Sequence, residues 1–161
     1  MAELHLSFIC SGNICRSPMA ALVFGDHLRR AGLAERVRVS SAGIGPWHVG
    51  DPADSRAVRT LAEGGYPTGH VAAQVDEHHL AADLLLAMDA GHEHALRDLL
   101  EHQGQAPERV RLLRSFDPAA AGDLDVPDPY YGGRHGFTEV LTMIESAVPG
   151  LLDWVCERLG P

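Results

Sequence analysis

The sequence predicts an α/β fold in which helices cover both faces of a parallel sheet. Short, mainly apolar runs alternate along the chain with longer segments of helical periodicity, as in chains built from strand–helix–strand units. The run Leu84–Met88 is apolar at every position, which is typical of a parallel strand buried on both faces. Another such run, Leu4–Ile9, leads directly into a glycine-containing loop and a helix start.

The first elements surround this loop. The strand Leu4–Ile9 ends at Cys10, a Ser-Pro pair then opens a helix expected at Met19–Arg30, and an Ala-Gly pair ends that helix. The next segment, Arg36–Ser40, alternates with period two, which predicts a short strand with its two valines on the buried face.

A glycine-rich loop at Ser41–Gly50 precedes the second helix. Asp54 has the side chain of a helix N-cap, and the helix is expected to end at Glu63 before a Gly-Gly pair. Its inward residues are expected to be Val58, Leu61 and Ala62. We assign His70–Val75 to a short extended piece.

The second half of the chain repeats the alternation. The strand Leu84–Met88 is ended by Asp89, and a helix follows at about His92–Glu101. Arg109–Leu113 is the last expected strand, and the proline-containing segment Ser115–Arg134 is expected to be a loop.

The C-terminal helix is expected at Phe137–Leu159. Pro149 is expected to kink or interrupt it. Its apolar residues recur at helical spacing: Val140, Leu141, Ile144, Val148, Leu151, Leu152 and Val155. Together these elements predict one Rossmann-like domain over residues 1–161, with a four-stranded parallel sheet and helices on both faces.

In such sheets ligands bind beyond the carboxyl ends of the strands, near the switch in strand order. The loop after Cys10 lies at one such end. Asp89 and the segment that holds Asp128 also follow strands. The topology can therefore bring these three segments together.

Composition excludes several classes of protein. The net charge is −9, and the 13 basic residues are scattered arginines, so we expect no binding to nucleic acid. No apolar run approaches the roughly 20 residues that span a bilayer, and the N-terminus lacks a basic signal region. Three cysteines without framework spacing favour a reducing cytoplasm, although export without a signal peptide stays open. The ten histidines match no trusted metal-ligand spacing, so we expect no metal.

The loop from Cys10 to Arg16 has the features of a phosphate cradle with a nucleophile. Converging backbone N–H groups, a helix N-terminus and a nearby guanidinium all favour a thiolate at Cys10 and also bind an oxyanion. Arg16 can hold two phosphate oxygens through its planar fork. Gly12 lets the backbone curl, Asn13 tolerates a left-handed turn, and Ser17 is near enough in sequence to donate a hydrogen bond to the thiolate.

This segment, C-S-G-N-I-C-R-S-P, resembles the signature of the low-molecular-weight protein tyrosine phosphatases. The segment Asp128-Pro129-Tyr130-Tyr131 resembles the late D-P-Y motif of the same family. The similarity runs across nearly the whole chain and is closest to the actinobacterial, mycobacterial secreted-type enzymes. The segments that carry this closer likeness are Trp47-His48-Val49-Gly50 and Leu113-Arg114-Ser115-Phe116-Asp117-Pro118.

The resemblance implies a two-step hydrolysis of phosphotyrosine without a cofactor. Cys10 attacks phosphorus to give a phosphocysteine, Arg16 and the loop amides hold the phosphate oxygens, and Asp128 is the general acid and then the base. The implied phosphate-binding loop comprises Cys10, Ser11, Gly12, Asn13, Ile14, Cys15 and Arg16. The implied support network comprises Asn13, Ser17, Ser41 and His70, and the implied substrate slot comprises Trp47, His48, Tyr130 and Tyr131.

Three other functions are possible for a loop of this kind, and the sequence argues against each of them. Arsenate reductases share this fold and loop but need a relay of further thiols, and they carry a cysteine pair on the segment after the third strand. The corresponding region here, residues 80–89, holds no cysteine. Phosphoarginine phosphatases resemble this loop but carry Thr where Ile14 stands, and the bulkier Ile14 is expected to crowd a guanidinium. A phosphotyrosine-binding module would need no acid, so Asp128 beside Cys10 and Arg16 argues against it.

Regulation and partners follow from the same residues. Mild oxidation is expected to join Cys10 and Cys15 reversibly and to protect Cys10. Tyr130 and Tyr131 are expected to be exposed and open to a tyrosine kinase. The expected partners are tyrosine-phosphorylated proteins. We expect the protein to be a cytoplasmic monomer that does not bind membranes.

Overall fold

The computed structural model describes residues 2–160 and contains one four-stranded sheet, in the order β2-β1-β3-β4. The strands are β1 (Leu4–Cys10), β2 (Val37–Gly43), β3 (Leu84–Ala87) and β4 (Val110–Leu112), and every pair in the sheet is parallel. The order reverses between β1 and β3, so the loop after β1 lies at the switch point where open α/β sheets bind ligands. The predicted fold class is confirmed.

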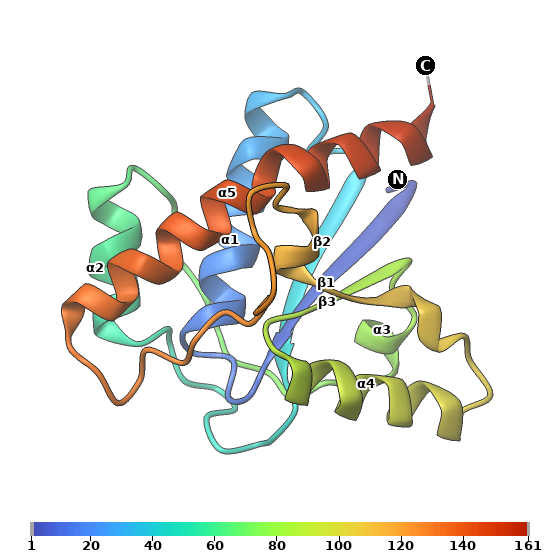
Figure 1. Cartoon of the computed structure of the whole chain (residues 1–161), viewed down its shortest axis with the longest axis horizontal. Helices are drawn as coiled ribbons and strands as arrows, with labels where there is room; N and C mark the ends of the chain where they lie inside the picture. The colour runs from blue at the N-terminus through green and yellow to red at the C-terminus, as the bar shows by residue number, and fades with distance from the viewer. Residues whose placement is uncertain (1, 161) are drawn as a thin grey trace.

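Helices cover both faces of this sheet (Figure 1). One face carries α1 (Arg16–Arg30), α2 (Ser55–Glu63) and α5 (Arg134–Leu159), and the other carries α3 (Glu77–Leu80) and α4 (Ala90–His102). Two short 3-10 turns, η1 (Pro107–Arg109) and η2 (Leu113–Phe116), flank β4.

The alternation of side chains along the strands divides the core between these two faces. In β1, Leu6 and Phe8 pack toward α1 and α5, whereas Ile9 packs toward α4. In β3, Leu84 and Leu86 belong to the first cluster, while the residue between them belongs to the second. All four residues of β3 are buried, as expected of a central parallel strand.

Helix α2 begins where the sequence predicts, but its buried face differs from the predicted one. Asp54 is its N-cap, and its carboxylate accepts a hydrogen bond from the Arg56 amide at 2.8 Å, as predicted. The predicted inward face is partly wrong. Leu61 is buried, but Val58 is half-buried and Ala62 is exposed, because the helix is rotated so that Ala57 and Thr60 face the core.

The segment predicted to be extended, His70–Val75, is not helical, makes a single parallel bridge, from Gln74 to Gly43, and otherwise lies outside the named strands. The following residues form the short helix α3, which the sequence analysis did not predict. Its N-cap is Asp76, whose carboxylate accepts from the His78 and His79 amides, and four residues are too few to show a helical period.

Pro149 was expected to kink or interrupt helix α5, and the helix is not interrupted. The helix continues from Arg134 to Leu159 although Pro149 has no N–H to donate. Packing compensates for the lost hydrogen bond, because α5 lies against α1, α2 and η2. Gly150 makes the closest approach: a Cβ at this position would overlap the carbonyl oxygen of Phe116. The Pro-Gly pair therefore lets α5 sit directly on η2.

We expect Gly150→Ala to destabilise the protein by about 1–3 kcal/mol, since its methyl group must push α5 away from Phe116. Gly25→Ala is the matched control in a helix. A Cβ at Gly25 meets no atom within 4 Å, so this variant is expected to gain about 0.5–1 kcal/mol. Urea unfolding of the two variants measures both effects. Equal changes in the free energy of unfolding would contradict the close approach.

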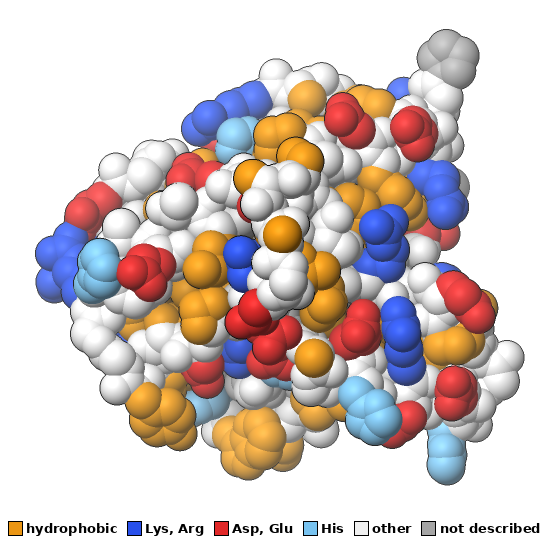
Figure 2. All heavy atoms as spheres, viewed as in Figure 1, with side chains coloured by type: hydrophobic (Ala, Val, Ile, Leu, Met, Phe, Trp, Pro, Cys, Tyr) orange, Lys and Arg blue, Asp and Glu red, His pale blue; other side chains and the backbone are white. Residues whose placement is uncertain are grey.

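The charged side chains are mixed on the surface that Figure 2 draws. On the face drawn in Figure 2 the arginines lie among acidic side chains and form no continuous basic patch. Within residues 2–160, no helix is both long and apolar enough to cross a membrane.

Candidate active site

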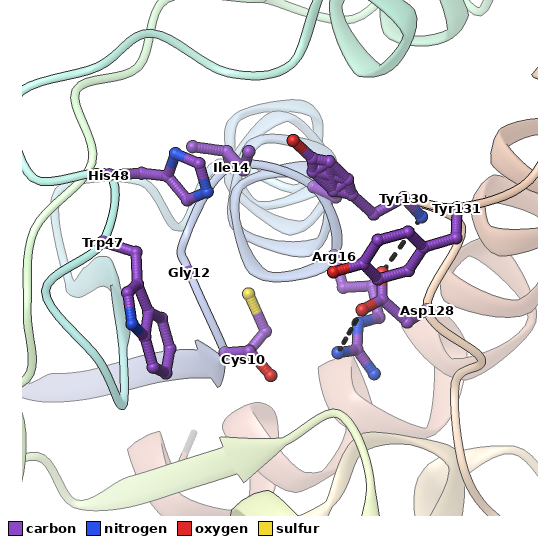
Figure 3. Close-up of a pocket in the computed structure, with 11 residues that line it drawn as sticks. Cys10, Gly12, Ile14, Arg16, Trp47, His48, Asp128, Tyr130 and Tyr131 are labelled. Atoms are coloured by element: carbon purple, nitrogen blue, oxygen red, sulfur yellow. Dashed lines mark hydrogen bonds and ion pairs between the residues drawn. The ribbon is translucent and has the colours of Figure 1, made fainter.

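A cavity of about 420 Å³ opens at the carboxyl end of β1, above the loop that joins β1 to α1. It brings together segments that are far apart in the sequence (Figure 3). Its lining residues are Cys10, Ser11, Gly12, Ile14, Cys15, Arg16, Trp47, His48, Asp128, Tyr130 and Tyr131.

Cys10 lies at the base of this cavity, where β1 ends. Its side chain is 3% exposed, and its Sγ lies 3.0 Å from the hydroxyl oxygen of Ser17. Ser17 belongs to the first turn of α1, whose positive end therefore faces the sulfur. A hydroxyl and a helix N-terminus both stabilise a thiolate.

Asn13 fixes the shape of the loop. Its φ of 60° is in the left-handed region, which Asn tolerates better than most residues. Its side-chain amide donates to the hydroxyls of Ser17 at 2.8 Å and Ser41 at 3.0 Å, and its Oδ1 accepts from the Ala73 amide at 2.9 Å. One buried side chain thus ties the loop to α1, to β2 and to the segment before α3.

His70 holds the backbone of the same residue. Its Nε2 lies 2.7 Å from the Asn13 carbonyl oxygen, which can only accept, so Nε2 carries the proton. Burial lowers the pKa of His70, which favours the neutral ring. The four predicted members of the support network, Asn13, Ser17, Ser41 and His70, are therefore connected in the structure.

Arg16 is buried and directed by two acceptors. Its Nη1 donates to Asp89 Oδ2 and to the Val126 carbonyl oxygen, both at 2.9 Å. Its Nη2 lies 3.6 Å from Asp128 Oδ2, across the mouth of the cavity. Both hydrogen bonds to the protein come from Nη1, which leaves the edge formed by Nε and Nη2 to face a ligand.

Asp128 lies on the same side of the cavity as Tyr130 and Tyr131, opposite Trp47 and His48 (Figure 3). The Tyr130 amide donates to its Oδ1 at 3.0 Å, which orients the carboxylate. The other oxygen faces Arg16. The side chain remains 42% exposed, so a proton can reach it from solvent.

Aromatic side chains form the walls above Cys10. Trp47 and His48 stand on one side and Tyr130 and Tyr131 on the other (Figure 3). The two tyrosine rings stack with centroids 5.0 Å apart and an interplanar angle of 16°. A Cβ on Gly12 would lie 2.8 Å from His48 Cδ2, so glycine allows this wall to approach the loop.

Three residues next to the cavity were not assigned a role from the sequence. Asp89 caps α4 and pairs with Arg16, and although its position at this sheet edge was expected, its partner was not. His92 contacts Ser11. Arg56 donates to the Tyr130 carbonyl oxygen at 3.0 Å and lies 5.6 Å from that ring. No motif signals these contacts, because they depend on how α2 and α4 pack beside the loop.

Cys15 is buried in the same loop but differs chemically from Cys10. Burial, followed by the negative charges of Asp54 and Cys10, raises the pKa of the Cys15 thiol to about 12. Cys15 is therefore a protonated thiol at neutral pH. Elsewhere in residues 2–160, no group of three or more metal-ligating side chains lies close enough together to hold a metal ion.

Comparison with known proteins gives consistent results. Residues 5–159 match the family described as low molecular weight phosphotyrosine protein phosphatase. Low molecular weight protein-tyrosine phosphatase A of Mycobacterium tuberculosis is 57% identical over 158 residues, which cover 98% of this chain and 94% of that protein. The low molecular weight protein-tyrosine-phosphatase of Streptomyces coelicolor is 53% identical, over 96% and 95% of the two chains.

A crystal structure supports the likeness in three dimensions. A protein tyrosine phosphatase from Entamoeba histolytica, solved with Hepes in its active site, superimposes with a TM-score of 0.89 at 31% identity. The match covers 98% of this chain and 99% of the other.

Proposed function

The chain belongs to the low molecular weight phosphotyrosine protein phosphatase family, and on that premise we propose a role for each residue of the cavity. The protein is a hydrolase of phosphotyrosine in proteins. Cys10 is the nucleophile, Arg16 and the loop amides bind the phosphate, and Asp128 is the general acid and base. The observation that carries this assignment is the meeting of these three side chains in one cavity, from three separate segments.

In the first step the Cys10 thiolate attacks phosphorus, so an S–P bond forms as the bond from phosphorus to the phenolic oxygen breaks. Asp128, as the general acid, gives a proton to the departing phenolate. In the second step water attacks phosphorus, Asp128 takes a proton from it, and the thiolate leaves. The Ser17 hydroxyl, 3.0 Å from the sulfur, stabilises that thiolate in both steps.

Arg16 supplies the charge that the transition state needs. Asp89 and Val126 hold Nη1, so the Nε–Nη2 edge is presented to two equatorial phosphate oxygens as a planar fork. Burial opposes ionisation of Asp89, yet hydrogen bonds from the His92 amide and Arg16 outweigh it and keep the pKa of this carboxyl below its ordinary value. The guanidinium is thus held by a permanent anion and remains in place between turnovers.

The walls of the cavity support an aryl phosphate as the substrate. Trp47 on one side and Tyr130 on the other offer faces against which a phenyl ring can stack. Ile14 also lines the cavity, at the position where phosphoarginine phosphatases that resemble this loop carry Thr. Its branched apolar side chain offers no partner to a guanidinium, which supports phosphotyrosine over phosphoarginine.

A comparison of three substrates tests this assignment. Peptides of one sequence carrying phosphotyrosine, phosphoserine or phosphoarginine are incubated with the protein, and phosphate release is measured. We expect the kcat/KM for phosphotyrosine to exceed the other two by at least about 100-fold, since the shorter phosphoserine cannot place its phosphate on the loop. Equal or faster release from phosphoarginine would overturn the proposed substrate.

We further propose that peroxide links Cys10 to Cys15. Peroxide oxidises the Cys10 thiolate to a sulfenic acid, and the Cys15 thiol then displaces water to form the disulfide. Burial and the high pKa of Cys15 make this closure slow at neutral pH and faster as pH rises. We expect Cys15→Ala to increase sulfinic acid at Cys10 after dilute peroxide, as measured by mass spectrometry. Equal sulfinic acid in wild type and variant would contradict the protection.

We also propose that the protein is a cytoplasmic monomer.

We propose as well that a tyrosine kinase modifies the two tyrosines beside the cavity. Tyr131 is 92% exposed and Tyr130 is 37% exposed, so a kinase can reach Tyr131 more readily. Incubation with a tyrosine kinase from the source cell, followed by peptide mapping, tests this. Absence of phosphate on both residues would remove the proposal.

A further inference from the structure

The first turn of α4 borders the phosphate-binding loop on the side away from α1. Within this turn, His92 is 5% exposed, and its ring Nε2 lies 2.9 Å from the hydroxyl oxygen of Ser11. Ser11 immediately follows Cys10 in the loop. A buried histidine from the other face of the sheet therefore contacts the residue next to the nucleophile.

The same turn also holds the other end of the loop. Asp89, the N-cap of α4, accepts from Arg16 with Oδ2 and from the His92 amide with Oδ1, both at 2.9 Å. The His92 Nδ1 lies 3.2 Å from that same Oδ1. The two carboxylate oxygens are thus divided between Arg16 and His92, and the contacts run continuously from Ser11 through His92 and Asp89 to Arg16.

The protonation state of His92 decides which group donates the hydrogen bond between His92 and Ser11. Burial is the largest influence on the ring and lowers the pKa of His92 to about 4, although the Asp89 carboxylate acts in the opposite direction. The other charged groups that act on the ring are Arg16, Asp125 and Asp128. The ring is therefore neutral at working pH. His92 Nδ1 makes no hydrogen bond within residues 2–160, but the Asp89 carboxylate 3.2 Å away favours a proton there electrostatically. That tautomer leaves Nε2 to accept from the Ser11 hydroxyl.

Ser11 is also fixed through its backbone. Its carbonyl oxygen accepts from the Gly45 amide at 3.1 Å. A Cβ on Gly43 would lie 2.6 Å from that oxygen, so β2 packs directly against it. The hydroxyl contact with His92 adds a third restraint, and the Ser11 peptide is left with little freedom to turn.

We propose that His92 is a positioning residue for phosphotyrosine hydrolysis. It accepts a hydrogen bond from the Ser11 hydroxyl and contacts Asp89, which in turn holds Arg16. The first turn of α4 therefore fixes the position of the start of the phosphate-binding loop relative to its end. The inference rests on the proposed roles of Cys10 and Arg16. It predicts that loss of the His92–Ser11 contact loosens phosphate binding and makes the Cys10 thiolate less stable.

The test compares variants that keep or remove the hydrogen bond. His92→Leu fills the space but cannot accept, and Ser11→Ala removes the donor from the other side. His92→Gln can place a polar atom near the position of Nε2. His94→Leu is the control on the same helix, because His94 is exposed and pairs with Asp98 rather than with the loop. Folding of every variant is checked by circular dichroism and Tm.

Three quantities are measured for each variant: kcat and KM for para-nitrophenyl phosphate, the inhibition constant of inorganic phosphate, and the pH dependence of Cys10 alkylation by iodoacetamide. We expect kcat/KM to fall about 10-fold in His92→Leu and in Ser11→Ala, as for the loss of one buried hydrogen bond. Phosphate inhibition weakens, and alkylation shifts to higher pH. His92→Gln recovers most of the loss, and the double variant is no worse than either single variant. His94→Leu behaves as wild type.

Two outcomes would overturn the inference: His92→Gln as impaired as His92→Leu, or losses that add in the double variant. The first would mean that a hydrogen bond to Ser11 is not what the imidazole contributes, and the second that the two residues act separately. Phosphate affinity is also measured by calorimetry in a Cys10→Ser background, where no turnover is needed. If Cys10→Ser kept its turnover, the proposed nucleophile would be wrong, whereas the calorimetric comparison would still decide the role of His92.

Discussion

Replacement of Cys10 by serine is expected to lower kcat for para-nitrophenyl phosphate by about 10⁴-fold or more, because a serine hydroxyl at this position has no adjacent base to ionise it. The cavity offers Ser17 and a helix N-terminus to the sulfur, and both stabilise an anion that is already formed. Neither accepts a proton strongly enough to generate an alkoxide. Steady-state kinetics with the two proteins at equal concentration measures the loss.

The matched control is Cys156→Ser, which changes an exposed cysteine of α5 far along the chain from the loop. It is expected to keep the wild-type kcat and KM. Calorimetry with inorganic phosphate is expected to show that Cys10→Ser still binds the anion, since Arg16 and the loop amides are unchanged. Residual turnover of Cys10→Ser within 10-fold of wild type would assign the nucleophile to another residue.

Replacement of Asp128 by alanine has the second-largest expected effect. We expect kcat to fall about 10²–10³-fold with KM nearly unchanged, because the acid acts on the leaving oxygen in the transition state and not on the bound substrate. The loss depends on the leaving group. The fall in kcat/KM, which reports the first step, is large for phenyl phosphate, whose phenolate needs a proton, and small for para-nitrophenyl phosphate, whose leaving group is already stable. The fall in kcat also includes the second step, which loses its base with either substrate.

Asp128→Asn separates chemistry from loop structure. The amide oxygen of Asn can still accept from the Tyr130 amide, so the loop geometry is retained while the transferable proton is lost. Both variants are expected to show the same dependence on the leaving group, and Asp153→Asn on the exposed surface of α5 is expected to show none. Equal losses of kcat/KM for phenyl and para-nitrophenyl phosphate would exclude Asp128 as the acid.

The fold was largely predictable because its signals are local and strong. An apolar run such as Leu84–Met88 and an N-cap such as Asp54 each carry their own structural consequence. The failures concern packing. Pro149 was expected to kink or interrupt α5. The helix is not interrupted, because the contact of Gly150 with Phe116 and the burial of the rest of the helix outweigh one missing hydrogen bond. Propensity alone cannot include such a contact, since the partner lies some 30 residues earlier in the chain.

The sequence predicted the residues that line the cavity better than the residues that support them. The loop motif and the late Asp-Pro-Tyr-Tyr segment identified the residues of the cavity, and the structure brings Cys10, Arg16 and Asp128 together there. The residues that hold this group in place were less visible. His92 looked like one exposed histidine among ten, because its burial depends on how α4 packs against β3. Arg56 likewise reaches Tyr130 only after α2 and the late loop have met.

The electrostatics of the site explain how an acidic chain binds a dianion. The net charge of −9 repels phosphate at long range, so binding depends on short-range donors in the loop. Arg16 is buried beside Asp89, where salt screens it little, and its free edge is directed at the ligand. We infer that the protein recognises phosphate through geometry and not through a general positive potential.

The phosphocysteine itself can be observed during turnover. Wild-type protein is mixed with para-nitrophenyl phosphate at mildly acidic pH, quenched within milliseconds and digested, and the peptide that contains Cys10 is analysed by mass spectrometry. In Asp128→Ala the second step also loses its base, so the intermediate is expected to accumulate to a larger fraction than in wild type. A phosphoryl group on Cys10 that appears and decays at the rate of turnover is the predicted result. Turnover with the phosphoryl group on another residue, or with no phosphoprotein in either form, would contradict the mechanism.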